Sequence, residues 1–210
     1  MTERVLALEL ASTVRHDGHG GVADDLTTPA ELDGWVRDRA DALDAGGFTA
    51  DEAALAEVRA LREAVRALFA RAVSPAPPSP ADAHRLLPLD RALERINTAA
   101  ARRPVAPRLE WAEQAPPALV QLGAAADPLT RVTAALARAT AEFLAGPGRE
   151  QLRACTAPRC VRYFLKGHGR QEYCKPSCSN RARVARHYRR QKAVSADWET
   201  GDIATELPRS

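Results

Sequence analysis

The sequence lacks any apolar run that approaches the ~20 residues of a membrane span, so no membrane partner is expected. A secretory leader is not expected either, because Glu9 interrupts the early apolar stretch from Val5 to Val14. The sequence also shows no nucleophile elbow, phosphate-binding loop or internal repeat. Together these absences predict a soluble, cytoplasmic protein that is not an enzyme.

Cysteine is scarce, and its four copies lie within 24 residues as Cys155-x4-Cys160-x13-Cys174-x3-Cys178. Two short-spaced pairs separated by a dozen or so residues can bring four thiolates around zinc, with zinc–sulfur distances of about 2.3 Å. The alternatives are a redox dithiol pair or two disulfides, for which about three connectivities exist. The expected reducing compartment favours zinc. We therefore predict one structural Zn²⁺ held by these four cysteines.

Four cysteine ligands leave no open position on the metal. A closed shell argues against catalysis at the zinc. It also argues against His168 and His187 as ligands, although both lie in the same region. A closed site of this kind orders a segment that is too short to build a core of its own.

Acidic residues are rare in the segment that holds the cysteines. From Arg149 to Lys192 there are 13 Lys and Arg against 2 Asp and Glu, a net +11, whereas the rest of the chain carries 17 against 25, a net −8. Arginine outnumbers lysine 27 to 3, so arginine alone is weak evidence, but all three lysines also lie in this segment. An acidic body joined to a basic end indicates contact with a polyanion, usually nucleic acid.

The acidic part, residues 1–146, reads as a mostly helical domain with a small sheet. Alternation of Leu6, Leu8 and Leu10 predicts a first strand that ends near Val14. Two short alternating segments predict strands at 108–111 and 119–122. Helices are expected from Thr28 to Leu43, from Thr49 to Phe69, from Pro80 to Arg103 with a kink or a break at Pro88, and from Asp127 to Leu144.

Helix ends and core residues follow from local signals. Thr28-Pro29 with Glu31 opens one helix, and Thr49 with Glu52 predicts a capping box for the next. Trp35 and Trp111 are expected in the core. We expect this domain to fold without zinc, because its apolar stripes belong to long helices.

The end of the first strand is a candidate effector pocket. Glu9, Ser12, Thr13, Arg15 and His16 gather polar groups there, and the alternative is an ordinary strand edge followed by a polar loop.

The cysteine segment, residues 149–192, is expected to form a small treble-clef-like zinc module of a β-hairpin and a helix. Runs 161–165 and 171–173 flank a turn at 166–170, which predicts a hairpin between the cysteine pairs. Arg159, Arg162 and Lys175 are placed to offset the negative charge of the thiolates. Beyond it, 193–210 is expected to be a disordered tail.

The helix after Cys178 is expected to have two faces. Val184, Ala185 and Tyr188 would pack, and Arg181 lies on that side and is expected to brace the zinc module. The residues expected to contact nucleic acid are Arg183, Arg186, His187, Arg190 and Lys192.

The run Cys178-Ser179-Asn180-Arg181, with its paired cysteines, aromatic segment and basic helix, resembles the CGNR zinc finger. In that family the finger follows an N-terminal regulatory domain called ABATE, which residues 1–146 resemble. One departure is Ser179, which stands where the motif has glycine. A serine costs stability if the position needs positive φ, or it could cap the helix.

The resemblance implies a DNA-binding transcription regulator whose N-terminal domain senses an effector or mediates association. A different reading is a zinc-dependent module that binds RNA or protein, or a thiol redox switch. The expected partners are DNA and a small-molecule effector, and a dimer is compatible with the sequence. The overall expectation is an α+β fold with a zinc module at its C-terminal end.

Overall fold

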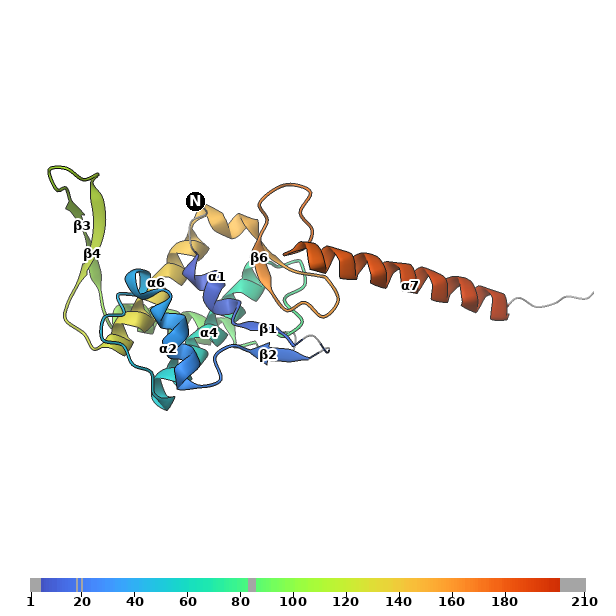
Figure 1. The fold of residues 1–210 in the computed structure, drawn as a ribbon, viewed down its shortest axis with the longest axis horizontal. Coiled ribbons are helices and arrows are strands. Elements are labelled where there is room, and N and C mark those ends of the chain that lie inside the picture. Colours follow the sequence, from blue (N-terminus) through green and yellow to red (C-terminus); the bar gives the residue numbers. More distant parts are fainter. Residues whose placement is uncertain (1–4, 18, 20, 83–85, 201–210) are drawn as a thin grey trace, which may run out of the picture.

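The computed structural model describes residues 5–17, 19, 21–82 and 86–200, with side chains as far as Lys192. Helices form a packed body, from which a hairpin projects at one end and a long helix projects at the opposite end (Figure 1). The helices of the body are α1 (Leu6–Ala11), α2 (Pro29–Arg37), α3 (Ala40–Leu43), α4 (Glu52–Ala72), α5 (Leu89–Ala101) and α6 (Pro128–Ala145).

The strands form three separate antiparallel pairs within the described residues: β1 (Val14–His16) with β2 (Val22–Asp24), β3 (Val105–Glu110) with β4 (Ala118–Gly123), and β5 (Leu152–Ala154) with β6 (Tyr163–Leu165). A 3-10 helix, η1 (Pro147–Gln151), follows α6, and the last helix is α7 (Pro176–Thr200). The predicted α+β class is confirmed. In the described part of the chain, no helix combines the length and the hydropathy of a membrane-crossing segment.

The predicted first strand is wrong, because Leu6–Ala11 is helix α1. Leu6, Ala7, Leu10 and Ala11 are buried together, which is a helical spacing. Leu6 and Leu10 can share one face in a strand or in a helix. Ala7 and Ala11 are buried on the same side as these leucines, which fits a helix and not a strand. The strand begins only at Val14, as β1.

Local capping signals were right for α2 and wrong for α4. Thr28 opens α2 as expected, and it forms a capping box with Glu31. At α4 the cap is Asp51, whose carboxylate accepts from Ala54 N at 2.7 Å, and not Thr49. Either residue type caps helices well, and the chain places the helix start two residues later.

Pro88 breaks the predicted third helix, as expected: it is the N-cap residue of α5, which begins directly after it, and the described residues before it are not helical. Proline has no N–H and suits the start of a helix better than its interior. Residues 83–85 of the predicted helix lie outside the described residues. The proline-rich segment 74–80 is a connector as expected.

The hairpin β3–β4 confirms the two strands predicted at 108–111 and 119–122. It extends away from the helices (Figure 1), and the expectation of a buried Trp111 is wrong, because its side chain is 72% exposed. Trp35 is partly buried and packs against the core. Alternating apolar residues indicate a strand, but they do not say whether anything covers it.

One core runs through the body and into the zinc module. Leu152 of β5 and Tyr163 of β6 are buried in the same cluster as residues of α1, α4, α5 and α6. The Phe69 ring meets Tyr163 edge-on at 5.5 Å. The predicted division between 1–146 and 149–192 therefore crosses a shared core.

Candidate metal centre and nucleic-acid interface

The four cysteines meet at one point, with their sulfur atoms all within 4.8 Å of one another. Cys160 and Cys174 Sγ are 3.7 Å apart, and Cys174 and Cys178 Sγ are 3.5 Å apart. Tetrahedral zinc with bonds of about 2.3 Å places its sulfur ligands about 3.8 Å apart. No cysteine is in a disulfide. The geometry fits one structural Zn²⁺.

The two cysteine pairs come from two local structures. Cys155 follows β5, and the turn to Cys160 is closed by a bond from Cys160 N to Ala157 O at 3.0 Å. Arg159 takes a left-handed conformation in this turn, with φ of 64°. Cys174 precedes α7, and Cys178 lies in the first turn of that helix. A turn and a helix start thus present two thiolates each.

The predicted hairpin between 161–165 and 171–173 is wrong. β6 pairs instead with the preceding strand β5, in the register Leu152↔Leu165 and Ala154↔Tyr163. Cys155 N also donates to Arg162 O at 2.9 Å, so the hairpin encloses the first cysteine pair. Because successive side chains of a strand point to opposite faces, Tyr163 enters the core of the body while Phe164 packs against the cysteines.

The chemistry of the thiols supports a cation at their centre. Hydrogen bonding with Cys160 lowers the pKa of Cys155, whereas hydrogen bonding with Cys155 raises the pKa of Cys174. Four thiolates need a metal ion to offset their mutual repulsion.

Arg181 is the cation that contacts a ligand sulfur, rather than the Arg159, Arg162 and Lys175 suggested by their sequence positions. Its Nη2 donates to Cys178 Sγ at 3.1 Å. Its Nη1 lies 2.5 Å from His16 Nε2 of β1. The side chain is half-buried and links the zinc module to the N-terminal domain, and these contacts support the predicted bracing role.

Ser179 is an ordinary residue of the first turn of α7. It is not among the described residues with positive φ, and its N–H donates to Lys175 O at 3.3 Å. The condition under which serine would cost stability, a positive φ, is therefore not met, and serine lies inside the helix instead of capping it.

A buried polar cluster joins the zinc module to the body. Arg66 of α4 binds Asp82 through two nitrogens at 2.8 and 2.9 Å, and it donates to Val161 O at 3.2 Å. Tyr163 donates its hydroxyl to the same carboxylate at 2.7 Å. Burial and the charge of Asp82 raise the pKa of Tyr163. Charged groups are rarely buried unless they are paired, so this cluster fixes the docking of β5–β6.

α7 stands clear of the body beyond its first turns (Figure 1). The predicted packing face does not pack: Val184 is 50% exposed and Tyr188 64% exposed, whereas Ala182 is buried. From Pro176 to Lys192 the helix holds six Lys and Arg and no acidic residue. All five residues expected to contact nucleic acid are exposed on it: Arg183, Arg186, His187, Arg190 and Lys192.

The helix extends further than expected. The tail predicted over 193–210 is helical as far as Thr200, and residues 201–210 lie outside the described part of the chain.

A groove between α7 and the loop before it brings two cations of the basic segment next to Arg186 of the helix. Its volume is about 540 Å³, and its lining includes three cations, Arg170, Lys175 and Arg186, against one acidic residue, Glu172. Arg170 and Lys175 belong to the +11 segment, but their approach to α7 depends on how the loop folds back. The basic surface thus extends beyond one face of the helix.

Three of the residues predicted to form an effector pocket do line one. Glu9, Ser12 and Thr13 surround a pocket of about 300 Å³ with Trp35 and Arg39, at the end of a helix and not of a strand. Arg39 donates to Glu9 at 2.6 Å and lies 4.3 Å above the Trp35 ring.

The other two predicted residues take different partners. Arg15 does not line the pocket and pairs with Asp25 at 2.5 Å, and His16 reaches Arg181 instead.

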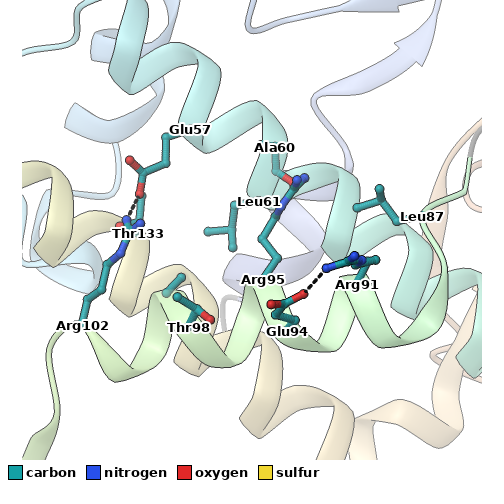
Figure 2. A pocket seen from close by; sticks show the side chains of 11 residues that line it. Glu57, Ala60, Leu61, Leu87, Arg91, Glu94, Arg95, Thr98, Arg102 and Thr133 are labelled. Atoms are coloured by element: carbon teal, nitrogen blue, oxygen red, sulfur yellow. Dashed lines mark hydrogen bonds and ion pairs between the residues drawn. The ribbon is translucent and has the colours of Figure 1, made fainter.

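A second pocket, between α4 and α5, was not indicated by the sequence. It holds about 520 Å³, with Leu61, Leu87 and Ala99 among its lining residues. Figure 2 shows its rim, where Glu57 pairs with Arg102 and Glu94 with Arg91. Arg95, a third arginine of the lining, donates to Ala60 O and pairs with Glu63 outside the pocket.

Comparison with known families agrees with this arrangement. Residues 4–147 match the ABATE family, described as "Putative stress-induced transcription regulator", and residues 151–191 match the CGNR zinc finger. No curated protein matches the sequence. The first match spans more than half of the chain and the second contains all four cysteines. The chain belongs to the ABATE family and is a zinc-binding protein with a CGNR zinc finger at its C-terminal end.

Proposed function

We propose that this protein is a DNA-binding transcription regulator that contacts DNA through α7 and performs no catalysis. The observation that carries the proposal is a helix with six cations and no acidic residue between Pro176 and Lys192, projecting from a four-cysteine zinc centre. A helix with its side chains is about 10–12 Å across, which suits the DNA major groove of about 12 Å. A closed thiolate shell gives the zinc a structural role.

The N-terminal domain would supply control, by binding an effector or by association. The pocket at Glu9, Ser12 and Thr13 lies directly before β1. His16, at the end of β1, contacts Arg181, which in turn contacts a zinc ligand. An effector that shifts β1 would therefore act on the base of α7. Replacing Ser12 by Trp should fill the pocket and abolish any effect of the ligand on DNA affinity.

Selection of bound fragments from genomic DNA, followed by binding measurements over a range of salt concentrations, tests the proposal. Arg183→Ala, Arg186→Ala and Arg190→Ala should each lower the salt slope of log K by about 1 if the contact is to phosphate. Loss of a base contact should instead cost about 1–3 kcal/mol at one position of the site. The matched control is Arg91→Ala, which removes an exposed arginine of α5. It should change neither the salt slope of log K nor the base preference at any position of the site.

The competing function is a zinc-dependent RNA- or protein-interaction module, or a thiol redox switch. No enriched DNA motif, together with tight binding of RNA or of a protein, would favour the interaction module. Loss of zinc on mild thiol oxidation, reversed by reductant, would favour the switch.

A further inference from the structure

The hairpin β3–β4 exposes large apolar side chains that nothing in the described part of the chain covers. Leu109 is 65% exposed, Leu119 67% and Trp111 72%. An isolated two-stranded hairpin is marginally stable in water, and exposed strand edges offer unpaired backbone groups to another chain. The base of this hairpin is nevertheless fixed, because buried Arg103 donates to Ala124 O at 3.2 Å and pairs with Asp44 at 2.6 Å.

The two edges of the hairpin differ. β3 contains Pro107 and the charged pair Arg108 and Glu110, which are features that discourage further strand pairing. β4, Ala118–Gly123, has neither proline nor charge. Only the β4 edge is therefore open to another strand.

Pro107 also determines which groups the open edge presents. Since proline has no N–H, it occupies a position whose nitrogen faces away from the partner strand. Its cross-strand partner is Gln121, so the backbone groups of Gln121 also face outward, as do those of Leu119 and Gly123 two residues away. These outward groups are the donors and acceptors available to an added strand.

We propose that β4 pairs antiparallel with β4 of a second copy of this chain, across a two-fold axis through Gln121, to form a four-stranded sheet. The axis places Leu119 opposite Gly123 of the partner and sets the two Gln121 residues face to face. Val120 then lies beside the partner subunit's Leu122. An uncharged strand suits this arrangement, because a two-fold axis places a central charge against its own copy.

The size of the contact sets the strength of the dimer. Pairing two six-residue strands covers less than the about 800 Å² per partner of a standard interface, so association should fall in the micromolar range. The hairpin and α7 project from opposite ends of the body (Figure 1), so this dimer carries its two zinc modules at its outer ends. The inference develops the association named above, and its test needs no DNA.

Sedimentation of the full zinc-loaded chain over a micromolar concentration range tests the proposal. The wild-type chain and Gln121→Ala, which keeps the backbone N–H, should dimerise. Gln121→Lys should weaken the dimer by about fivefold, because two ammonium groups face each other. An equimolar mixture of Gln121→Lys and Gln121→Glu should restore association. Zinc content and circular dichroism should be unchanged, since Gln121 is exposed.

Two outcomes would overturn the proposal. A monomer at every concentration would mean that a different protein covers the hairpin or that nothing does. A dimer that neither charge variant weakens, and that Gln121→Pro leaves intact despite the lost N–H, would place the contact on another surface.

Discussion

Single residues in this protein connect parts of the chain that are far apart in sequence. Arg181 reaches Cys178 Sγ and His16, 165 residues away. Arg66 reaches Ala11 O, Asp82 and Val161 O from one side chain. Arginine suits these positions because its planar guanidinium offers five donors in fixed directions.

Arg181→Ala should loosen the zinc site before it changes any contact with nucleic acid. A hydrogen bond from a charged group contributes about 1.5–3 kcal/mol, and the variant loses one to the Cys178 sulfur. We expect a lower melting temperature and faster loss of zinc to a chelator. Arg183→Ala, on the exposed part of the same helix, is the control. Equal rates of zinc loss for the two variants would contradict the bracing role.

The elements differ in how far local sequence determines them. α2 starts where its capping box indicates, and α6 starts at its Asp127 cap. β6 takes a different partner from the one expected, because strand pairing depends on segments that meet only in the folded chain. Helix ends are determined by neighbouring residues, whereas the hydrogen bonds between paired strands depend on segments that can be far apart in the sequence.

The capping box of α2 should give the protein a measurable acid dependence. Hydrogen bonds, first of all from the Thr27 hydroxyl, lower the pKa of Glu31 to about 2. A lowered pKa means that this stabilisation is complete above the ordinary value of 4.5 and is lost as the pH falls towards 2. Glu31→Gln should therefore show a weaker loss of stability than the wild type between pH 5 and 2, as measured by urea unfolding.

The companion variant, Thr28→Ala, removes the other half of the box and should cost about 1 kcal/mol at neutral pH. Identical acid profiles for Glu31→Gln and the wild type would show that the box does not contribute.

At the scale of the whole molecule, the zinc module and the helical body share buried contacts. Leu152 and Tyr163 lie in the core of the body, and the Arg66 cluster bonds to Val161 O. The hairpin, the body and α7 are arranged in a line (Figure 1), and the four-cysteine site, which includes Cys178 in the first turn of α7, joins the body to this helix. Loss of zinc should therefore destabilise both the helical body and the start of α7.

Removal of zinc by a chelator should disorder the module and destabilise the body without unfolding it. α4, α5 and α6 keep most of their own core, so most helical circular dichroism should remain at room temperature. The melting temperature should fall, because each large side chain withdrawn from the core forfeits about 2 kcal/mol. Cys174→Ser should reproduce this state and respond no further to chelator. Complete loss of helix would instead show one cooperative unit.

The zinc ligands, the basic C-terminal segment and most of the helices could be predicted from the amino-acid sequence. Cysteine spacing, charge and helix caps act over a few residues, so their consequences hold in almost any fold that contains them. The five residues placed on the surface of α7 are exposed for the same reason, although their contact with nucleic acid stays a prediction.

Which segments meet depends on the three-dimensional fold. It paired β6 with β5, made Leu6–Ala11 a helix, exposed Trp111, and brought His16 to Arg181. Apolar patterns show that a side chain prefers to be buried, but burial depends on whether a distant segment reaches it. The contacts that bury an apolar side chain join residues that are far apart in the sequence, so a short stretch of sequence cannot show them.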